Sequence, residues 1–92
     1  MKIKVIDILY SDNGKGKCRE SKVGKRYERR KNKIYEVDFR NVLPWGGLAM
    51  YEVDNPSKGI FTTEYDGIED FGNGRVDIYT WNSIYVCEKV ED

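Results

Sequence analysis

Residues 71–90 read FGNGRVDIYTWNSIYVCEKV, and this stretch decides the fold class. Its first five residues place two glycines around an asparagine, which is typical of a tight hairpin turn. Apolar and polar side chains then alternate as far as Trp81, and after Asn82 and Ser83 a second run continues to residue 90. Alternation with a period of two is the pattern of a β-strand with two different faces. The stretch therefore predicts a turn followed by two β-strands.

Comparable short runs cover much of the remaining chain. Further strands are predicted at 2–10, 33–40, 48–53 and 60–65, and turn-forming residues separate them. Within the first of these runs the apolar side chains change face after Val5, which predicts a β-bulge or a strand buried on both sides. The whole chain therefore has six or seven short strands.

Regularly spaced short strands in a chain of this length predict an all-β fold. We expect residues 1–92 to form one domain, a small antiparallel barrel or strongly bent sheet of six to seven strands, SH3-like or OB-like. Closure into a barrel would also remove the sheet edges that a small sheet exposes. Residues 18–33 have no apolar periodicity and fit a long loop, an exposed hairpin or one short helical turn. A single helical turn near 25–31 or 66–71 is the most helix that the sequence allows.

The composition excludes two broad classes of protein. Hydrophobic residues make up 39% of the chain and charged residues 35%, which is too apolar for a disordered chain and too charged for a membrane protein. No apolar run approaches the roughly 20 residues that span a bilayer, and the first residues do not form a signal-peptide core. The sequence therefore predicts a cytoplasmic protein without a membrane partner.

The chain contains no histidine, so it lacks the commonest general base and the commonest metal ligand. Residues 14–17, Gly-Lys-Gly-Lys, match a P-loop only in part, because Cys18 stands where Ser or Thr is needed and the first glycine is missing. The acidic residues at 64–66 and 69–77 are interpreted as solvated turn residues rather than a metal site. We expect no catalysis, no cofactor and no metal.

The two cysteines, Cys18 and Cys87, are far apart in the sequence and form no C-x-x-C motif. Such a pair predicts neither a disulfide-rich secreted scaffold nor a zinc site. Cys87 lies in a predicted strand and is expected to be a small buried hydrophobe. Cys18 has cationic neighbours that would favour a thiolate, but such neighbours alone rarely define a nucleophile.

Charge is distributed very unevenly along the chain, although the total is zero. Residues 1–42 carry 13 Lys and Arg against six Asp and Glu, whereas residues 43–92 carry three against ten. One outcome is a molecule with a basic face and an acidic face. The other is a sheet that pairs early strands with late strands, so that opposite charges meet across strands. The sequence leaves both outcomes open.

The basic segment, residues 14–33, holds ten Lys or Arg against two Glu. Arginine binds phosphate bidentately, a tyrosine ring lets a base stack on it, and a glycine-flanked loop offers backbone amides to an anion. The candidate ligand-binding residues are Lys15, Lys17, Arg19, Lys25, Arg26, Tyr27, Arg29, Arg30 and, outside the segment, Trp45. The alternative is a solvated loop that only blunts an exposed sheet edge.

The pairs Lys25 with Arg29 and Arg26 with Arg30 are spaced by four residues. Residues at this spacing share a face in a strand and in a helix alike. The four cations are therefore expected to form one surface whichever structure the segment adopts.

Aromatic residues are frequent, at 13% of the chain. Trp45 stands in a Pro-Trp-Gly-Gly turn and is expected at the surface, where a large ring is available for binding. Tyr35, Phe39, Tyr79 and Tyr85 occupy strand positions and are expected to fill the core.

Residues 59–65 and 75–86, with their Thr-Thr and Thr-x-Asn-Ser-x-Tyr steps, resemble a strand–turn–strand pattern in short uncharacterised proteins of phages and mobile elements. The resemblance covers the C-terminal third of the chain. It implies a non-catalytic protein that acts by binding, as such proteins often do when they block a host defence enzyme or sequester a nucleotide signal.

Together these features predict a non-catalytic binding module that engages a nucleic acid or a nucleotide through residues 14–33. The alternative is a phage-type inhibitor that contacts a host defence protein through aromatic and acidic residues. The sequence is compatible with a homo-oligomer in either case.

Overall fold

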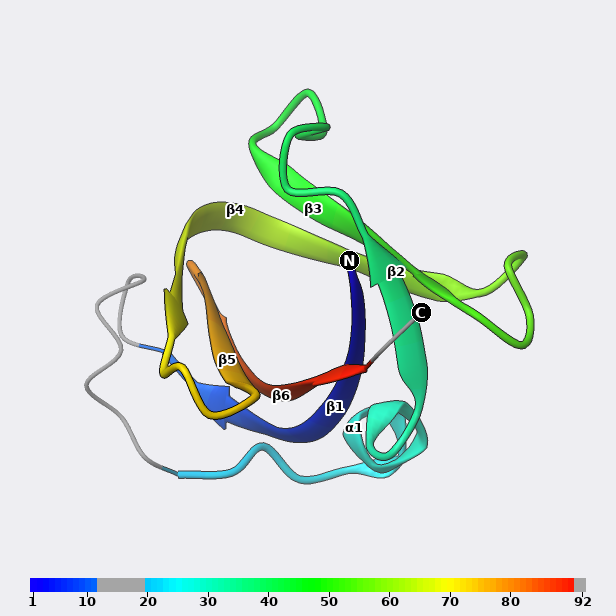
Figure 1. The fold of residues 1–92 in the computed structure, drawn as a ribbon. Helices are drawn as coiled ribbons and strands as arrows, with labels where there is room; N and C mark the ends of the chain where they lie inside the picture. The colour runs from blue at the N-terminus through cyan, green and yellow to red at the C-terminus, as the bar shows by residue number, and fades with distance from the viewer. Residues whose placement is uncertain (12–19, 91–92) are drawn as a thin grey trace.

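The computed structural model describes residues 1–11 and 20–90. Six strands form a closed barrel, and one short helix lies outside its wall (Figure 1). The elements are β1 (Lys2–Tyr10), α1 (Lys25–Arg30), β2 (Ile34–Val37), β3 (Gly47–Glu52), β4 (Gly59–Asp70), β5 (Arg75–Thr80) and β6 (Ser83–Val90). The prediction of an all-β antiparallel barrel is confirmed, and the closer likeness to SH3-like or OB-like barrels stays a prediction.

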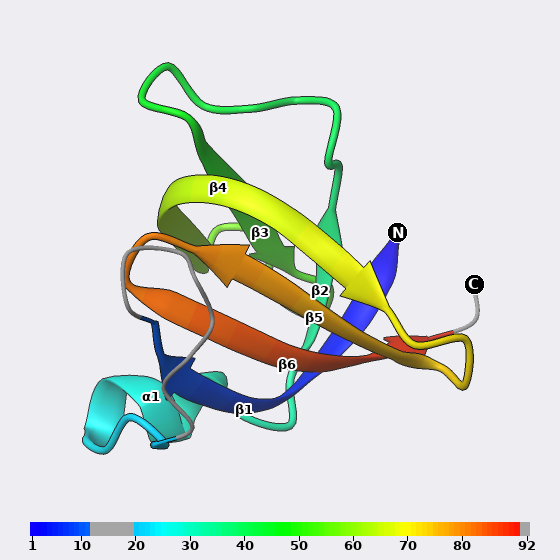
Figure 2. The ribbon, with the colours of Figure 1, turned by 90° about the vertical axis from the view of Figure 1, so that its left-hand side faces the viewer.

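The strands follow one another around the barrel in sequence order. Each strand pairs antiparallel with its neighbours in the chain, and β6 returns to pair with β1 from Lys2↔Val90 to Tyr10↔Ser83 (Figure 2). This is the order of an up-and-down meander. Closure gives every strand a partner on each side, although β4 pairs with β3 in its first half and with β5 in its second half. It leaves none of the described strands as an open edge of the sheet.

The core fills the inside of the barrel with side chains from all six strands. Its members are Ile3, Val5, Ile8, Tyr35, Val37, Leu48, Met50, Ile60, Val76, Ile78, Tyr85 and Cys87. The predicted burial of Tyr35, Tyr85 and Cys87 is confirmed, and Phe39 packs against this core from its rim. The prediction for Tyr79 was wrong, because Ile78 and Thr80 take the inward phase of β5 and leave Tyr79 half-buried on the outer side.

The predicted irregularity in the first strand is a β-bulge. The register of β1 against β6 shifts between Val5 and Asp7. Ile3 and Val5 before the shift and Ile8 after it are all fully buried, although their spacing changes from two residues to three. The bulge thus keeps the inner face apolar where strict alternation would turn Ile8 outward.

The strand β4 is longer than the sequence predicted. It continues to Asp70 and pairs with β5 through Glu69↔Asp77 and Asp70↔Val76, so the helical turn considered for residues 66–71 is wrong. Polar residues on both faces of this segment hide the period of two, and its strand conformation depends on pairing with β5 instead.

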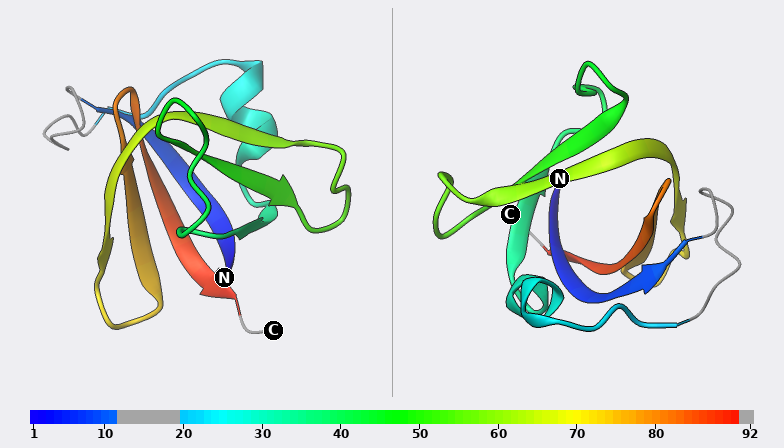
Figure 3. Two further views of the ribbon diagram at one scale, coloured as in Figure 1. Left: turned by 90° about the horizontal axis from the view of Figure 1, so that it is seen from above. Right: turned by 180° about the vertical axis from the view of Figure 1, so that it is seen from behind.

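The segment after residue 19 runs outside β1 before it enters the helix (Figure 3). Leu9 and Ser21 form an isolated β-bridge, and the Lys22 amide donates to the Ile8 carbonyl at 2.8 Å. Of the three conformations considered for 18–33, the described part is therefore an extended stretch followed by a single short helix, which confirms the helical turn near 25–31.

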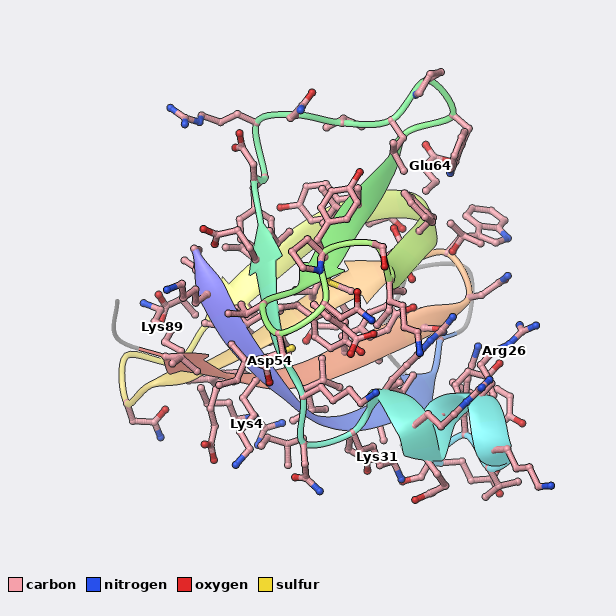
Figure 4. The ribbon with its side chains drawn as sticks, turned by 90° about the vertical axis from the view of Figure 1, so that its right-hand side faces the viewer. Lys4, Arg26, Lys31, Asp54, Glu64 and Lys89 are labelled. Atoms are coloured by element: carbon pink, nitrogen blue, oxygen red, sulfur yellow. The ribbon has the colours of Figure 1, made fainter. Side chains whose placement is uncertain are left out.

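The charge asymmetry survives folding in part. The ion pair between Lys33 Nζ and Glu52 Oε1, at 3.3 Å, joins the basic half of the chain to the acidic half. The cations of α1 nevertheless gather on one side of the barrel, and the acidic end of the β4–β5 hairpin lies on the other. In Figure 4, Arg26 marks the first side and Lys89, which pairs with Asp70 of that hairpin, marks the second.

Candidate anion-binding site

The helix α1 has only six residues and depends on the barrel for its position, since isolated helices this short are unstable in water. Tyr27 anchors it by packing against the core. Gly24, at φ 126°, precedes the helix in a conformation that residues with a Cβ rarely adopt. At the other end, Lys31 Nζ pairs with Asp7 Oδ1 at 3.3 Å and with Glu28 Oε1 at 3.1 Å.

The carboxylate of Asp7 is the fixed point on the barrel for this anchor. Burial disfavours its charge, but hydrogen bonds from Ser21 Oγ, the Ile8 amide and Lys31 outweigh burial and lower its pKa. Asp7 is therefore ionised at neutral pH and holds both the extended stretch and the helix end against β1.

A cleft of about 400 Å³ opens between α1 and the turn that joins β3 to β4. We call it the basic cleft. It is lined by Arg26, Arg29, Arg30, Lys33, Tyr35, Glu52, Ser57, Lys58, Gly59 and Phe61. Five of these residues are cations and one is an acid, and that acid, Glu52, is already paired with Lys33. The cleft thus presents a strong excess of positive charge to a ligand.

The arginines of the basic cleft have no acidic partner among residues 1–11 and 20–90. Arg26, Arg29 and Arg30 make no ion pair with any residue that the structure describes, and neither does Lys58. Guanidinium groups are weakly hydrated and present several donors in a fixed plane, which suits them to bind phosphate or carboxylate. As far as the described residues go, their donors are available to a ligand without the loss of an ion pair.

A second, smaller cleft of about 140 Å³ lies on the other side of Arg26 and Arg30. We call it the hydroxyl cleft. Its lining is Lys22, Arg26, Tyr27, Arg30, Phe61, Thr62, Thr63, Asn82, Ser83 and Tyr85. No acid is among these residues, and hydroxyl and amide groups accompany the three cations. Such a lining offers hydrogen-bond donors and positive charge to an anion.

Arg30 occupies the junction of the two clefts, because it lines both. Burial raises the pKa of Tyr35, in the basic cleft, to about 12, and the charge of Arg30 partly opposes this rise. Burial also raises the pKa of Tyr85, in the hydroxyl cleft, and Arg30 opposes that rise as well. Both phenols are thus neutral at physiological pH and place no negative charge beside Arg30.

Phe61 is the main functional candidate that the sequence analysis missed. Its side chain is 58% exposed and lines both clefts, while its strand neighbours Ile60 and Thr62 are buried. The ring of Tyr51 packs edge-on against it, with centroids 5.9 Å apart. The sequence contains a sign of this exposure, because Phe61 alternates with Ile60 and Thr62. The register of β4 is needed to tell which of these residues face outward.

The tyrosine chosen from the sequence plays a different part. The ring of Tyr27 already contacts two cations, with Lys22 Nζ at 5.2 Å and Arg30 Cζ at 5.9 Å from its centroid. A ring in this position orients the cations through cation–π attraction rather than serving as a free platform for a base.

The other sequence-predicted residues are spread over several places. Arg26, Arg29 and Arg30 meet in the basic cleft as expected, and Lys25 is exposed on the same helix but does not line either cleft. Trp45 is 58% exposed as predicted, yet it lies before β3, at the opposite end of that strand from Glu52, and its indole donates to the Thr62 carbonyl at 2.9 Å. It lines neither cleft. Lys15, Lys17, Arg19 and Cys18 lie outside the described residues.

Residues 1–11 and 20–90 contain neither a cluster of metal ligands nor a membrane-spanning helix. Within these ranges no three Cys, Asp or Glu side chains gather as metal ligands would. No helix there has the length and hydropathy to cross a bilayer.

Comparison of the chain with protein-family models, with curated proteins and with solved structures found no match.

Proposed function

We propose that the protein is a non-catalytic binding module for a phosphate-bearing ligand, a nucleic acid or a nucleotide, and that the basic cleft is its site. The observation that carries this proposal is the convergence of three arginines and two lysines on one hollow whose single acid is already paired. Phosphate groups are the anions that such arginine clusters bind best. Both ligand classes are abundant in the cytoplasm, where we place the protein.

The simpler alternative is that these cations are only solvated. Like charges repel each other, so cations that only solvate a surface are expected to be spread out rather than gathered in one hollow. The arginines of α1 instead share a concave surface with Lys33, which follows the helix, and with Lys58, which comes from the distant turn between β3 and β4. A concave wall also focuses positive potential toward an incoming anion.

The direct test is charge reversal in the cleft. The variant Arg26→Glu/Arg30→Glu should fold normally, since neither arginine takes part in an ion pair among the described residues. Binding of a labelled single-stranded oligonucleotide, followed by fluorescence anisotropy at about 50 mM salt, should be abolished. For single replacements, the slope of log K against log salt should flatten by about 0.7 for each phosphate that the variant no longer binds.

The matched control reverses two cations elsewhere. Arg40→Glu/Lys89→Glu changes the net charge by the same amount, and both residues lie outside the basic and hydroxyl clefts. It should bind nearly as well as the unmodified protein. Equal losses in the two double variants would show that net charge, not the cleft, attracts the polyanion. No binding by the unmodified protein would reject the proposal.

A second candidate function rests on the acidic side of the molecule. The β4–β5 hairpin exposes Ile68 and Phe71, 40% and 44% exposed, beside Glu69 and Asp70. Exposed apolar side chains beside charges are typical of protein-binding surfaces, as a phage-type inhibitor of a host protein would need. Capture of a protein that binds with a shallow salt dependence, and is lost on Phe71→Ala, would favour this function over the first.

A further inference from the structure

We infer that the two clefts form one continuous site for a single-stranded nucleic acid, in which one base stacks on Phe61 between two bound phosphates. The inference rests on the proposed function and specifies its ligand as a polymer. Its structural basis is that Arg26, Arg30 and Phe61 line both clefts, so the two hollows share one wall.

The sizes of the clefts suit different parts of a nucleotide chain. The basic cleft, at about 400 Å³, falls in the range of roughly 300–1,000 Å³ that is typical of small-molecule sites. The hydroxyl cleft, at about 140 Å³, lies below this range and suits a compact group such as one phosphate. Its cations, Lys22, Arg26 and Arg30, are suitable partners for phosphate oxygens.

Phe61 supplies a stacking surface for a base between the two positions proposed for phosphates. More than half of the residue is exposed, and the T-shaped contact with the ring of Tyr51 restricts the orientation of the Phe61 ring. Base-on-aromatic stacking tolerates every base, because each base has a flat face, and a phenylalanine ring offers no hydrogen bond that would select one. The site is therefore expected to bind with little sequence preference.

The order phosphate, base, phosphate is that of a chain of at least two nucleotides. A mononucleotide would fill one cleft and leave the other empty. A duplex keeps its bases stacked inside and presents only its phosphates, so its bases would not reach Phe61. The arrangement therefore selects a single strand over both.

The test is a length series measured by competition against a labelled oligonucleotide. Competitors are the mononucleotide, oligothymidylates of two to eight nucleotides, the matching oligouridylates and a duplex of equal length. Affinity should rise steeply as both clefts become filled, and the duplex should bind more weakly than the single strand. The uridylate arm distinguishes RNA from DNA as the source of the strand.

The variant Phe61→Ala isolates the stacking interaction. It should weaken binding of the octanucleotide by about 5- to 100-fold and leave binding of inorganic tripolyphosphate unchanged. Phe61→Trp should restore oligonucleotide binding. Phe71→Ala is the matched control, because Phe71 is also an exposed ring beside an arginine, Arg75.

The outcomes separate the two proposals. Equal affinity for mononucleotide and oligonucleotide, a duplex that binds as tightly as a single strand, or equal effects of Phe61→Ala and Phe71→Ala would overturn this inference while leaving anion binding at the cleft in place. Absence of binding to every competitor, tripolyphosphate included, would reject the proposed function itself.

Discussion

The basic cleft and the end of the β4–β5 hairpin both concentrate charge, but they treat it in opposite ways. At the hairpin end, residues 69–77, Arg75 donates two hydrogen bonds of 3.1 Å to the buried carboxylate of Asp77, and Lys89 pairs with Asp70. The arginines of the basic cleft make no ion pair with a described residue. Arg75 thus stabilises the fold at the hairpin end, whereas the arginines of the basic cleft remain available to a ligand.

This difference gives a general criterion for small β-proteins. The sequence shows a basic segment and an acidic one, but charge counts alone do not say which cations are used internally. Burial of the partner carboxylate does: Asp77 is 1% exposed, so Arg75 is needed where it stands. Charges without such a partner contribute little to stability and are available for binding.

The largest effect is expected from removing the arginine at the hairpin end. Arg75→Ala leaves the Asp77 carboxylate buried without its ion-pair partner, which should cost about 2–3 kcal/mol of unfolding free energy. Arg26→Ala should change stability by less than about 0.5 kcal/mol, because it breaks no ion pair. Urea unfolding at neutral pH measures both, and equal costs would contradict the distinction between the two ends.

The second effect is a difference in the pH range over which the basic cleft and the hairpin end lose stability. Burial raises the pKa of Tyr35 in the basic cleft to about 12, while an unfolded tyrosine titrates near 10. The contribution of this phenol is complete below about pH 10 and is lost as the pH rises toward 12, reaching a loss of about 1.4 kcal/mol near pH 11. We expect Tyr35→Phe to lose less stability than the unmodified protein between about pH 9 and pH 11 in urea titrations.

The hairpin end responds at the opposite extreme. A hydrogen bond from Lys89 and another from the Gly72 amide lower the pKa of Asp70, so its contribution is present at neutral pH and is lost as the pH falls through the folded pKa. If the unmodified protein and Tyr35→Phe lost the same stability between about pH 9 and pH 11, the assignment of the alkaline loss to Tyr35 would be wrong.

A third, smaller effect is stabilisation by a polyvalent anion. Tripolyphosphate at about five times its dissociation constant should raise the unfolding free energy by about 1 kcal/mol, because it binds only the folded cleft. The melting temperature should rise by roughly 4–8 °C for a domain of this size. Sodium chloride at the same ionic strength is the control, and the Arg26→Glu/Arg30→Glu variant should show no specific rise.

The smallest effect is expected for the exposed ion pair of the hairpin. Lys89 and Asp70 are each 41% exposed, so Lys89→Ala should cost no more than about 0.5 kcal/mol. The cost should fall further at high salt and disappear once Asp70 is protonated. A loss as large as that of Arg75→Ala would mean that exposure is a poor guide to the value of an ion pair in this barrel.

The fold was largely predictable because short segments of the sequence determine most of its strands. The inward phase of Val76, Ile78 and Thr80 follows from alternation alone, and the change of face after Val5 predicted the bulge. The core assignment of Tyr79 was wrong even though the same alternation turns this residue outward, between Ile78 and Thr80. The far end of β4 was mispredicted because its local pattern is ambiguous: pairing with β5 decides its conformation, and the segment alone does not contain that information.

The site was predictable only where it is built from neighbours in sequence. Arg26, Arg29 and Arg30 are recognisable as a group because any regular structure keeps them close. Phe61 and Lys58 join them only through the closure of the barrel, so composition and spacing do not identify them. Trp45 is exposed as predicted, because it lies in a turn. Its distance from the basic cleft was not predicted, because the position of that turn depends on the tertiary fold.

The pairing of β1 with β6 also sets the order in which this chain acquires its structure. A ribosome adds roughly 5–20 residues per second, so β1 waits on the order of ten seconds for its partner. Until then β1, with its apolar residues Ile3, Val5 and Ile8, is held only by the three-residue pairing with β2 and by hydrogen bonds to the segment around α1 among the described residues. Hairpins made of adjacent strands form early, and the joining of the first strand to the last completes the barrel late. In a nascent chain the residues of β1 are therefore the ones most accessible to proteases and chaperones.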